Sequence, residues 1–325
     1  MLDPLQPYRH LCNTPSEAIR WACILEATAP KAGNVFPGRS FKDLSHSDFM
    51  AAAEITSNCF NKNELRISQR MLNSVTQIRE KLATNVNLGI VLLLGPLVAA
   101  DEATHEATHE ATHEATHEAT HEATHEATTT TNTSPTSRCN IQHLADWIDP
   151  VSKSLNQFDE VDGKNIFNAI QLGTAGGLGS SEQMDVNHSH ETIDIREAMS
   201  LAKSHDQIAQ QYCVGFSDLI LEITPILFNS IAASRDILLG ISHAQIELLG
   251  RFPDTLIARK NGKQVACDVQ KRARSVNPQD VAQVGAFDQY LRSQGNQLNP
   301  GTTADLLAAS LYLLLRTNPL ENNHE

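Results

Sequence analysis

The stretch Leu306-Leu307-Ala308-Ala309-Ser310-Leu311-Tyr312-Leu313-Leu314-Leu315 decides the fold class of this chain. It is apolar nearly all round, whereas a helix on the surface of a globular protein carries its apolar residues on one face only. We therefore expect a buried core helix over residues 303–316. The polar turn Asn299-Pro300-Gly301-Thr302-Thr303 comes directly before it, as is typical of a helix start.

Apolar residues recur at helical spacing along the rest of the chain, and the alternation typical of strands is hard to find. We expect Ser16 and Ser47 to cap the first two helices. No alternation of strands with helices is visible, so the sequence predicts an all-α fold with a single multi-helix globular domain. The spacing predicts helices over 17–28, 47–56, 64–82, 88–100, 141–157, 163–172, 194–213, 216–239, 241–250, 263–276 and 279–294.

The longest apolar run extends from Leu88 to Ala100 and is interrupted by Gly95-Pro96. It is too short to cross a bilayer, so we expect a buried central helix with a kink at Pro96. The N-terminus lacks the basic segment and apolar core of a signal peptide. These features predict a cytoplasmic protein with no membrane partner.

Residues 101–140 form a low-complexity insertion that begins with a four-residue Glu-Ala-Thr-His repeat. It divides the predicted domain into an N-terminal part, residues 1–100, and a remainder of the same domain, residues 141–325. The repeat contains His-Glu-x-x-His five times, starting at His105, and this spacing is the signature of zinc proteases. Every register of the repeat matches, so the match is a consequence of repetition. We interpret the tract as a solvated surface insertion whose histidines could bind zinc or nickel adventitiously.

The composition excludes several functional classes. The formal net charge is −13, and seven of the negative charges come from glutamates of the repeat. The chain has no cluster of basic residues of the kind that binds nucleic acid regardless of its sequence. No nucleic-acid partner is therefore expected. The six cysteines include no Cys-x-x-Cys pair, which argues against a disulfide framework and favours a reducing compartment. The oligomeric state is not fixed by the sequence, and a homo-oligomer is one state that it allows.

Three short polar turns each precede an apolar stretch, at residues 30–34, 85–89 and 299–305. A Gly/Asn turn that precedes a helix presents unpaired backbone N–H groups at the positive end of the helix dipole, where anions bind. Most such turns are only connections, but three of them predict a ligand rich in phosphate. The residues expected to contribute are Lys31, Gly33, Asn34, Asn85, Asn87, Gly89, Asn299 and Gly301.

Acidic residues near the first turn suggest a site for a magnesium polyphosphate. Glu26 and Asp43 are expected to hold Mg²⁺, while Lys31, in a loop expected to be exposed, contacts phosphate. The alternative is an ordinary helix end followed by a loop. Asp43 could equally lie in the segment that leads into the N-cap of the next helix.

The remaining candidates have equally plain alternatives. Asn85 and Asn87 could bind a nucleotide or only cap the following helix. Arg259 and Lys260 could contact phosphate or decorate a helix C-terminus. Asp305 could contact a metal or hydroxyl, or only favour a helix N-terminus. The glycine-rich segment 173–179 matches no phosphate-binding pattern and is interpreted as a loop.

Taken together, these segments resemble the triphosphoribosyl-dephospho-CoA synthase family. The first motif is Glu26 followed by residues 30–35 and 43–49, which is similar to the family pattern E-x-x-x-x-P-K-P-G-x-V with a D-M-x-x-x-x-F segment. Residues 85–90 look like a second motif. The set is completed by segments 198–212, 252–260 and 299–308. The resemblance covers nearly the whole chain outside residues 101–140.

The resemblance implies an all-helical transferase that acts on ATP and 3′-dephospho-CoA with Mg²⁺. Members displace adenine from ATP and attach the triphosphoribosyl group to the acceptor, which gives a prosthetic-group precursor. By matching positions, Lys31, Arg259 and Lys260 would bind phosphates. Glu26 and Asp43 would bind metal or stabilise charge, Asn85 and Asn87 would contact the nucleotide, and Asp305 would be a metal ligand or general base.

One motif departs from the family pattern. Better-known members have N-T-H-K-G where this chain has Asn85-Val86-Asn87-Leu88-Gly89, so a histidine and a lysine are replaced by Asn87 and Leu88. This divergent N-x-N-L-G form resembles a branch found beside tetrahydromethanopterin-type one-carbon cofactor genes. A nucleotide-dependent step in making such a cofactor is therefore the first alternative. A non-catalytic nucleotide-binding helical protein is the second.

Overall fold

A computed structural model of the 325-residue chain describes residues 3–84, 86–122, 141–174 and 194–317, without the side chains of 106–122. Within these ranges the fold is all-α, as the sequence predicts, and it forms one domain. The described residues contain no strand beyond an isolated bridge between Phe36 and Arg39.

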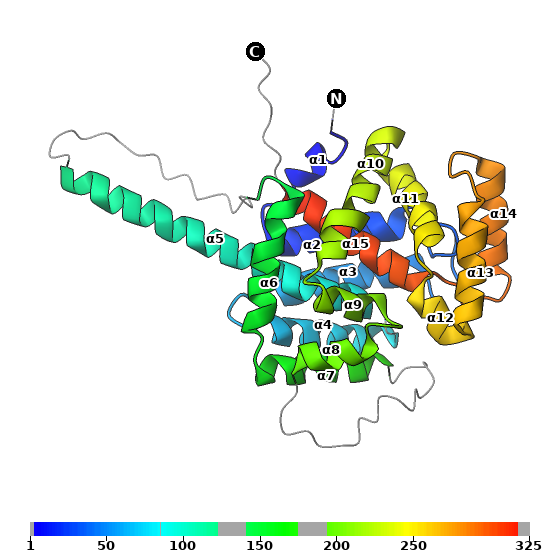
Figure 1. Cartoon of the computed structure of the whole chain (residues 1–325), viewed down its shortest axis with the longest axis horizontal. Helices are drawn as coiled ribbons and strands as arrows, with labels where there is room; N and C mark the ends of the chain where they lie inside the picture. The colour runs from blue at the N-terminus through cyan, green and yellow to red at the C-terminus, as the bar shows by residue number, and fades with distance from the viewer. Residues whose placement is uncertain (1–2, 85, 123–140, 175–193, 318–325) are drawn as a thin grey trace, which may run out of the picture.

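Most helices follow one another with short connections in the described part of the chain, whereas residues 29–45 form a long connection between α2 and α3 (Figure 1). A 3₁₀ turn, Leu144–Trp147, precedes α6, and a π-helical turn, Leu219–Ile223, precedes α10. The α-helices are α1 (Gln6–Arg9), α2 (Pro15–Thr28), α3 (His46–Phe60), α4 (Ile67–Leu82), α5 (Leu88–Glu122), α6 (Ile148–Gln157), α7 (Glu160–Thr174), α8 (Ile195–Ala202), α9 (Gln207–Cys213), α10 (Thr224–Ser234), α11 (Ile237–Arg251), α12 (Thr255–Asn261), α13 (Lys263–Arg274), α14 (Val281–Arg292) and α15 (Gly301–Arg316).

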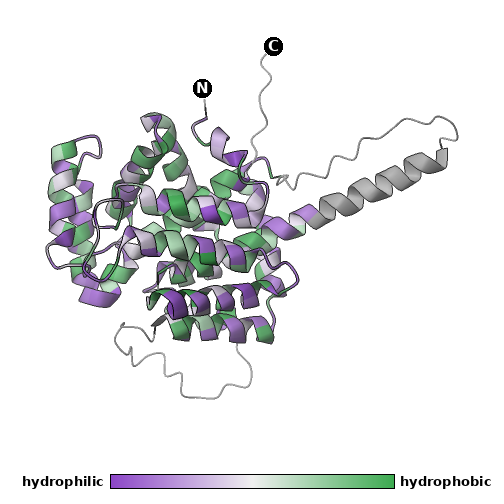
Figure 2. Cartoon of the chain, turned by 180° about the vertical axis from the view of Figure 1, so that it is seen from behind, coloured by the Kyte–Doolittle hydropathy of each residue, from purple (hydrophilic) through white to green (hydrophobic). Residues whose placement is uncertain are grey.

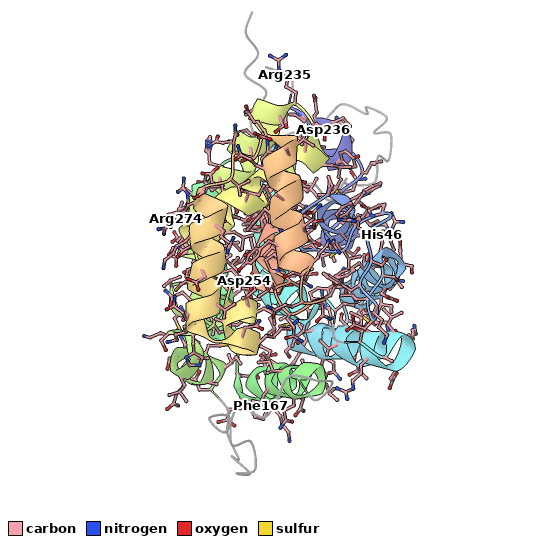
Figure 3. All side chains as sticks on the ribbon, turned by 90° about the vertical axis from the view of Figure 1, so that its right-hand side faces the viewer. His46, Phe167, Arg235, Asp236, Asp254 and Arg274 are labelled. Atoms are coloured by element: carbon pink, nitrogen blue, oxygen red, sulfur yellow. The ribbon has the colours of Figure 1, made fainter. Side chains whose placement is uncertain are left out.

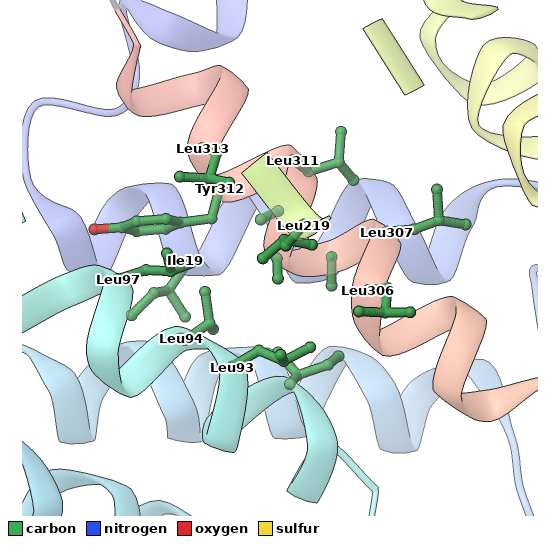
Figure 4. Packing of buried hydrophobic residues seen from close by; sticks show 14 of the residues in the cluster. Ile19, Leu93, Leu94, Leu97, Leu219, Leu306, Leu307, Leu311, Tyr312 and Leu313 are labelled. Atoms are coloured by element: carbon green, nitrogen blue, oxygen red, sulfur yellow. The ribbon is translucent and has the colours of Figure 1, made fainter. Parts of the chain in front are cut away.

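Helix α15 forms the centre of the fold, as its sequence predicts. It packs against α2, α5, α10 and α11, so it is covered on all sides (Figure 1). Figure 4 shows its leucines against Leu93, Leu94 and Leu97 of α5 and against Ile19 of α2. The outer helices alternate hydrophilic and hydrophobic residues along their length (Figure 2), because only one face of each meets the core.

Helix α5 begins in the core at Leu88 and continues through Pro96 into the Glu-Ala-Thr-His repeat, as far as Glu122. The expected apolar run is therefore part of a longer helix. Its segment Leu88–His105 is long and apolar enough to match a membrane span, but 67 % of that segment is buried inside the protein. Burial, and not shortness as the sequence analysis assumed, identifies this segment as a core helix. Figure 1 shows the repeat extending away from the helical body.

Several helix boundaries differ from the predicted ones. Helix α2 is capped by Thr14 instead of Ser16, through a capping box with Glu17, and α3 is capped by Ser45 instead of Ser47. The single helix expected over 194–213 is two helices, α8 and α9, because Asp206 caps a new helix. Helix α1 was not predicted, and α12 was anticipated only by the alternative that Arg259 and Lys260 decorate a helix C-terminus; both helices are one or two turns long and carry little periodicity.

Helices α12, α13 and α14 form a lobe with a small core of its own beside the central one (Figure 1). This core joins the lobe to the turn after α2, because Ala32 packs within it next to Leu249 and Leu291. The lobe thus packs the 32–34 turn against α11 and α14. Those elements surround the polar residues described in the next subsection.

A buried ion pair joins the two central helices at the end remote from these polar residues. Arg316 of α15 donates to both carboxylate oxygens of Asp101 on α5, at 2.6 and 3.0 Å, and to the carbonyl of Cys12 at 2.8 Å. The hydroxyl of Tyr312 donates to the same carboxylate at 2.6 Å. Asp101 and Arg316 are at most 2 % exposed, so each charge depends on its partners for solvation.

We expect Asp101→Ala to lower the free energy of unfolding by about 3–5 kcal/mol, since it leaves the Arg316 guanidinium buried without its counter-charge. Glu54→Ala is the control, because Glu54 pairs with Arg20 at a half-exposed position and should cost no more than about 1 kcal/mol. Urea unfolding monitored by circular dichroism measures both. Equal losses for the two variants would contradict this interpretation.

Candidate functional site

The core helix α15 is buried along its whole length except at two residues near its N-terminal end. Among its sixteen residues only Gly301, at its first position, and Asp305, in its second turn, are not fully buried. An acidic residue at this place faces a polar environment in the middle of an otherwise apolar helix. Asp305 is therefore the residue from which we describe the site.

Gly89 allows the side chain of Asp305 to lie against the first turn of α5. A Cβ atom at position 89 would lie 2.0 Å from Oδ2 of Asp305 and 2.7 Å from Cδ1 of Ile208. Only glycine leaves room for that approach. Asn87, two residues earlier, has a φ of 67°, a conformation that asparagine tolerates better than most residues. The turn 85–89 and the start of α15 thus meet, as the sequence analysis expected; Asn85 itself lies outside the described residues.

The pKa of Asp305 is raised well above its usual range. Burial is the largest cause, and the negative charges of Glu26, Asp254 and Asp206 raise it further, while the Arg259 guanidinium lowers it. Residues from α2, from the N-cap of α9 and from both ends of α12 therefore lie close enough to act electrostatically on one carboxyl group. Such shifts are concentrated at functional sites.

Lys31 is buried and forms an ion pair, which corrects the expectation of an exposed loop position. Its side chain is 0 % exposed, its Nζ lies 2.9 Å from Oε1 of Glu26, and it also donates to the Glu26 carbonyl. The loop after α2 turns back over the helix end, so the lysine neutralises Glu26 inside the protein. Lys31 also acts on His46, whose pKa is lowered by burial and by the lysine charge. Substitution of Lys31 would destabilise the fold, since it would leave Glu26 without its counter-charge.

Asp254 joins the start of α12 to the start of α15. It is 1 % exposed, accepts from the backbone N–H of Ile257 at 3.0 Å, and accepts from the N–H and hydroxyl of Thr303 at 2.8 Å. Burial raises its pKa more than these hydrogen bonds lower it. In the view of Figure 3, Asp254 projects near the centre of the molecule, and His46 lies at the side, on α3. Asp254 thereby fixes the position of α15 relative to Arg259 and Lys260.

The polar groups of the turn 32–34 bind other parts of the protein. Gly33, with a φ of +73°, donates its N–H to Oδ1 of Asp288 at 2.8 Å. Asn34 donates to Oδ1 of Asn299 at 2.7 Å and accepts from buried Gln245 at 2.7 Å. The first and third predicted phosphate-binding turns therefore lie side by side. Gly301 packs on Leu256, which a Cβ atom would meet at 2.4 Å.

Glu26 and Asp43, which the sequence analysis paired as magnesium ligands, have separate partners. Glu26 is buried with Lys31, whereas Asp43 is exposed and accepts from Asn296 at 2.8 Å. The carbonyl of Asn296 in turn accepts from Lys260 at 3.1 Å. The acids that act on Asp305 together with Glu26 are Asp254 and Asp206. Magnesium binding by Glu26 and Asp43 stays a prediction, and Asp43 acts on Lys260 together with Asp254.

Among the described residues, three amide side chains at the site carry an atom without a hydrogen-bond partner. They are Nδ2 of Asn87, a residue 5 % exposed, Oε1 of Gln207 at the start of α9, and Oε1 of Gln245 at the turn 32–34. Buried polar atoms are normally paired, so an unpaired donor and two unpaired acceptors indicate a polar ligand. Neither Gln207, Asp206 nor Asp254 was a candidate from the sequence. The sequence signal for these residues was an aspartate at a helix start, in the pairs Asp-Gln and Asp-Thr, and aspartate caps of this kind are common.

The excess of carboxylates at the site suits a divalent cation that binds together with the phosphates of a substrate. Glu26, Asp206, Asp254 and Asp305 carry four carboxylates, compensated locally by Lys31 and Arg259, which lies 3.4 Å from Asp206. Within the described part of the chain no group of three metal-binding side chains is preformed. Mg²⁺ is usually held by one or two carboxylates together with substrate phosphates. The partly exposed Asp305 and Asp206 are the two acids suited to that arrangement.

Comparison with known proteins identifies a family and a solved structure that this chain resembles. The family model CitG, described as ATP:dephospho-CoA triphosphoribosyl transferase, matches residues 12–324. A crystal structure of a proposed triphosphoribosyl-dephospho-CoA synthase from Archaeoglobus fulgidus matches with a TM-score of 0.56 at 20 % sequence identity, covering 82 % of this chain and 98 % of that one. At this identity the structural match demonstrates the shared fold. No curated protein matches the chain.

The raised pKa of Asp305 predicts how stability depends on pH. A carboxyl group whose pKa is higher in the folded state stabilises the fold only while protonated, so this contribution is lost as the pH rises through the raised pKa. We therefore expect Asp305→Asn to be more stable than the parent at pH 8, with the difference shrinking towards pH 4. Urea unfolding across this range measures it, with Asp268→Asn on the exposed face of α13 as the control. A less stable Asp305→Asn at pH 8 would contradict this account.

Proposed function

This chain belongs to the CitG family of ATP:dephospho-CoA triphosphoribosyl transferases, and we propose that it transfers the triphosphoribosyl group of ATP to 3′-dephospho-CoA with release of adenine. The family is a transferase family that uses ATP and dephospho-CoA as substrates. The observation that supports the proposal most is the convergence of three distant segments on Asp305, the one acid that interrupts the buried face of α15.

In the proposed reaction the 2′-hydroxyl of dephospho-CoA attacks the anomeric carbon of the ATP ribose. The new carbon–oxygen bond replaces the carbon–nitrogen bond to adenine, which leaves with the electron pair and takes up a proton. The proton of the attacking hydroxyl passes to a carboxylate, and we assign this role to Asp305. Burial and the neighbouring acids raise its pKa, which makes the carboxylate a stronger proton acceptor than an exposed aspartate.

The surrounding charges would stabilise the positive charge that develops on the ribose. Glu26 and Asp254 are buried beside Asp305 and each is held by hydrogen bonds or an ion pair, so their charges are fixed in place before the reaction. Lys31 positions Glu26 and is not expected to touch the phosphates. Arg259, whose side chain is 46 % exposed, is the cation beside Asp305 that can reach a phosphate.

Asn87 and Gln207 would contact the leaving adenine. The unpaired Nδ2 of Asn87 is a donor and the unpaired Oε1 of Gln207 is an acceptor, and an adenine edge offers a ring nitrogen that accepts beside an amino group that donates. A hydrogen bond from Asn87 to a ring nitrogen would also favour departure of the base. Asp206, together with the substrate phosphates, would hold Mg²⁺, which would neutralise the triphosphate, while Asp305 stays free to accept the hydroxyl proton.

The direct test is chromatographic detection of adenine, with mass spectrometry of the second product, after incubation with Mg-ATP and dephospho-CoA. We expect adenine and the triphosphoribosyl adduct in equal amounts, and a kcat lowered about 10²–10⁴-fold in Asp305→Asn. Asp268→Asn, away from the site, is expected to keep the parent rate. ATP binding without adenine release from any acceptor would refute transferase activity, and release only with a pterin acceptor would identify the other branch.

Asn87→Asp tests base recognition at nearly constant size and with a similar tolerance of positive φ. We expect the variant to fold normally but to raise the KM for ATP and lower kcat, together by about tenfold or more in kcat/KM, because the donor is replaced by an acceptor. The KM for dephospho-CoA should change little. An unchanged kcat/KM for ATP would exclude Asn87 from adenine binding, and thermal unfolding checks the fold.

A further inference from the structure

A second polar feature lies on the protein surface beyond the turn 32–34. The loop after that turn and the end of α14 enclose an open hollow of about 350 Å³, lined by Gly38, Arg39, Ser40, Phe41, Lys42 and Arg292. Three of these six residues are cations. The hollow lies outside the group of acids around Asp305, and no residue of it was a candidate in the sequence analysis.

The cations of the hollow outnumber the acids that compensate them. Asp288 is the carboxylate that holds the two arginines, with Arg39 at 2.6 Å and Arg292 at 2.8 Å. Hydrogen bonds from Gly33, Arg39 and Arg292 outweigh burial and lower the pKa of Asp288, so it stays charged. Lys42 is exposed and has no ion pair among the described residues. The hollow is thus left with an excess of positive charge.

The guanidinium groups are held in place before any ligand binds. Arg292 lies over the ring of Phe41, with its Cζ 4.7 Å from the ring centroid, and it also donates to the carbonyl of Asn34. Asp288 binds both arginines and the N–H of Gly33 at once. A planar guanidinium fixed by an aromatic ring and a carboxylate is the side chain best suited to bind phosphate oxygens.

The hollow is connected to the site through a chain of contacts. Asp43, next to Lys42, accepts from Asn296, whose carbonyl accepts from Lys260. Arg259, adjacent to Lys260, pairs with Asp206 and acts on Asp305. Cations therefore extend from the hollow towards Asp305, whereas the acids around Asp305 would repel a phosphate chain. A nucleotide whose ribose lies at Asp305 needs such a cationic region for its phosphates.

We propose that the hollow formed by Arg39, Lys42 and Arg292 binds the diphosphate or triphosphate chain of a nucleotide substrate. The assignment to a substrate rests on the proposed function, whereas the binding of a polyphosphate anion does not. Two sources share this chemistry, the triphosphate of ATP and the diphosphate of dephospho-CoA. The experiment below distinguishes them.

Isothermal titration with inorganic tripolyphosphate tests anion binding without any catalysis. We expect Lys42→Glu to weaken binding about tenfold or more and Arg39→Ala to weaken it in the same direction. Lys164→Glu, an exposed position on α7 with the same change of charge, should bind as the parent does. Absence of binding by the parent protein, or equal effects of Lys42→Glu and Lys164→Glu, would overturn the proposal.

Steady-state kinetics of the same variants identify the source of the phosphates. A KM raised about tenfold for ATP alone would assign the hollow to the triphosphate, and one raised for dephospho-CoA alone would assign it to the acceptor. Weaker tripolyphosphate binding with both KM values unchanged would overturn the substrate role. If the parent protein releases no adenine at all, the proposed function fails while the titration still decides whether the hollow binds polyphosphate.

Discussion

The fold depends on the burial of α15, because this helix supplies the apolar centre against which α2, α5, α10 and α11 pack. At each end of this helix, buried polar side chains have hydrogen-bond or packing partners within the protein. At the C-terminal end, Arg316 and Tyr312 share the carboxylate of Asp101. At the N-terminal end, Asp254 binds Thr303, and Asp305 lies against a glycine. Burial of the helix therefore fixes Asp305 relative to segments that are more than 200 residues away in sequence.

The acids around Asp305 explain why the nearby lysine is internal. Glu26, buried at the end of α2, needs a counter-charge within the protein, and Lys31 supplies it at 2.9 Å. This arrangement leaves the site with an excess of negative charge beside Asp305, offset there by Arg259, while further positive charge lies at Lys260 and at the hollow lined by Arg39, Lys42 and Arg292. The separation suits a substrate whose reacting ribose becomes positive and whose phosphates are negative.

Much of the fold could be predicted from the sequence because helical periodicity and a continuous apolar run are local signals. The core helix, the all-α class and most helices follow from them. The environment of each site residue is decided by partners distant in sequence, such as Asp288 for Gly33, Asp254 for Thr303 and Asn296 for Asp43. No local pattern contains that information. For this reason Lys31 was expected to be exposed, although it is buried with Glu26.

The central claim is that the nucleotide reacts beside Asp305. A crystal structure with Mg²⁺, dephospho-CoA and a non-reactive ATP analogue tests it most directly. The account predicts a ribose between the first turn of α5 and α15, with Asp305 within hydrogen-bond reach of the acceptor hydroxyl. A nucleotide bound elsewhere, with Asp305 in contact with water alone, would contradict it.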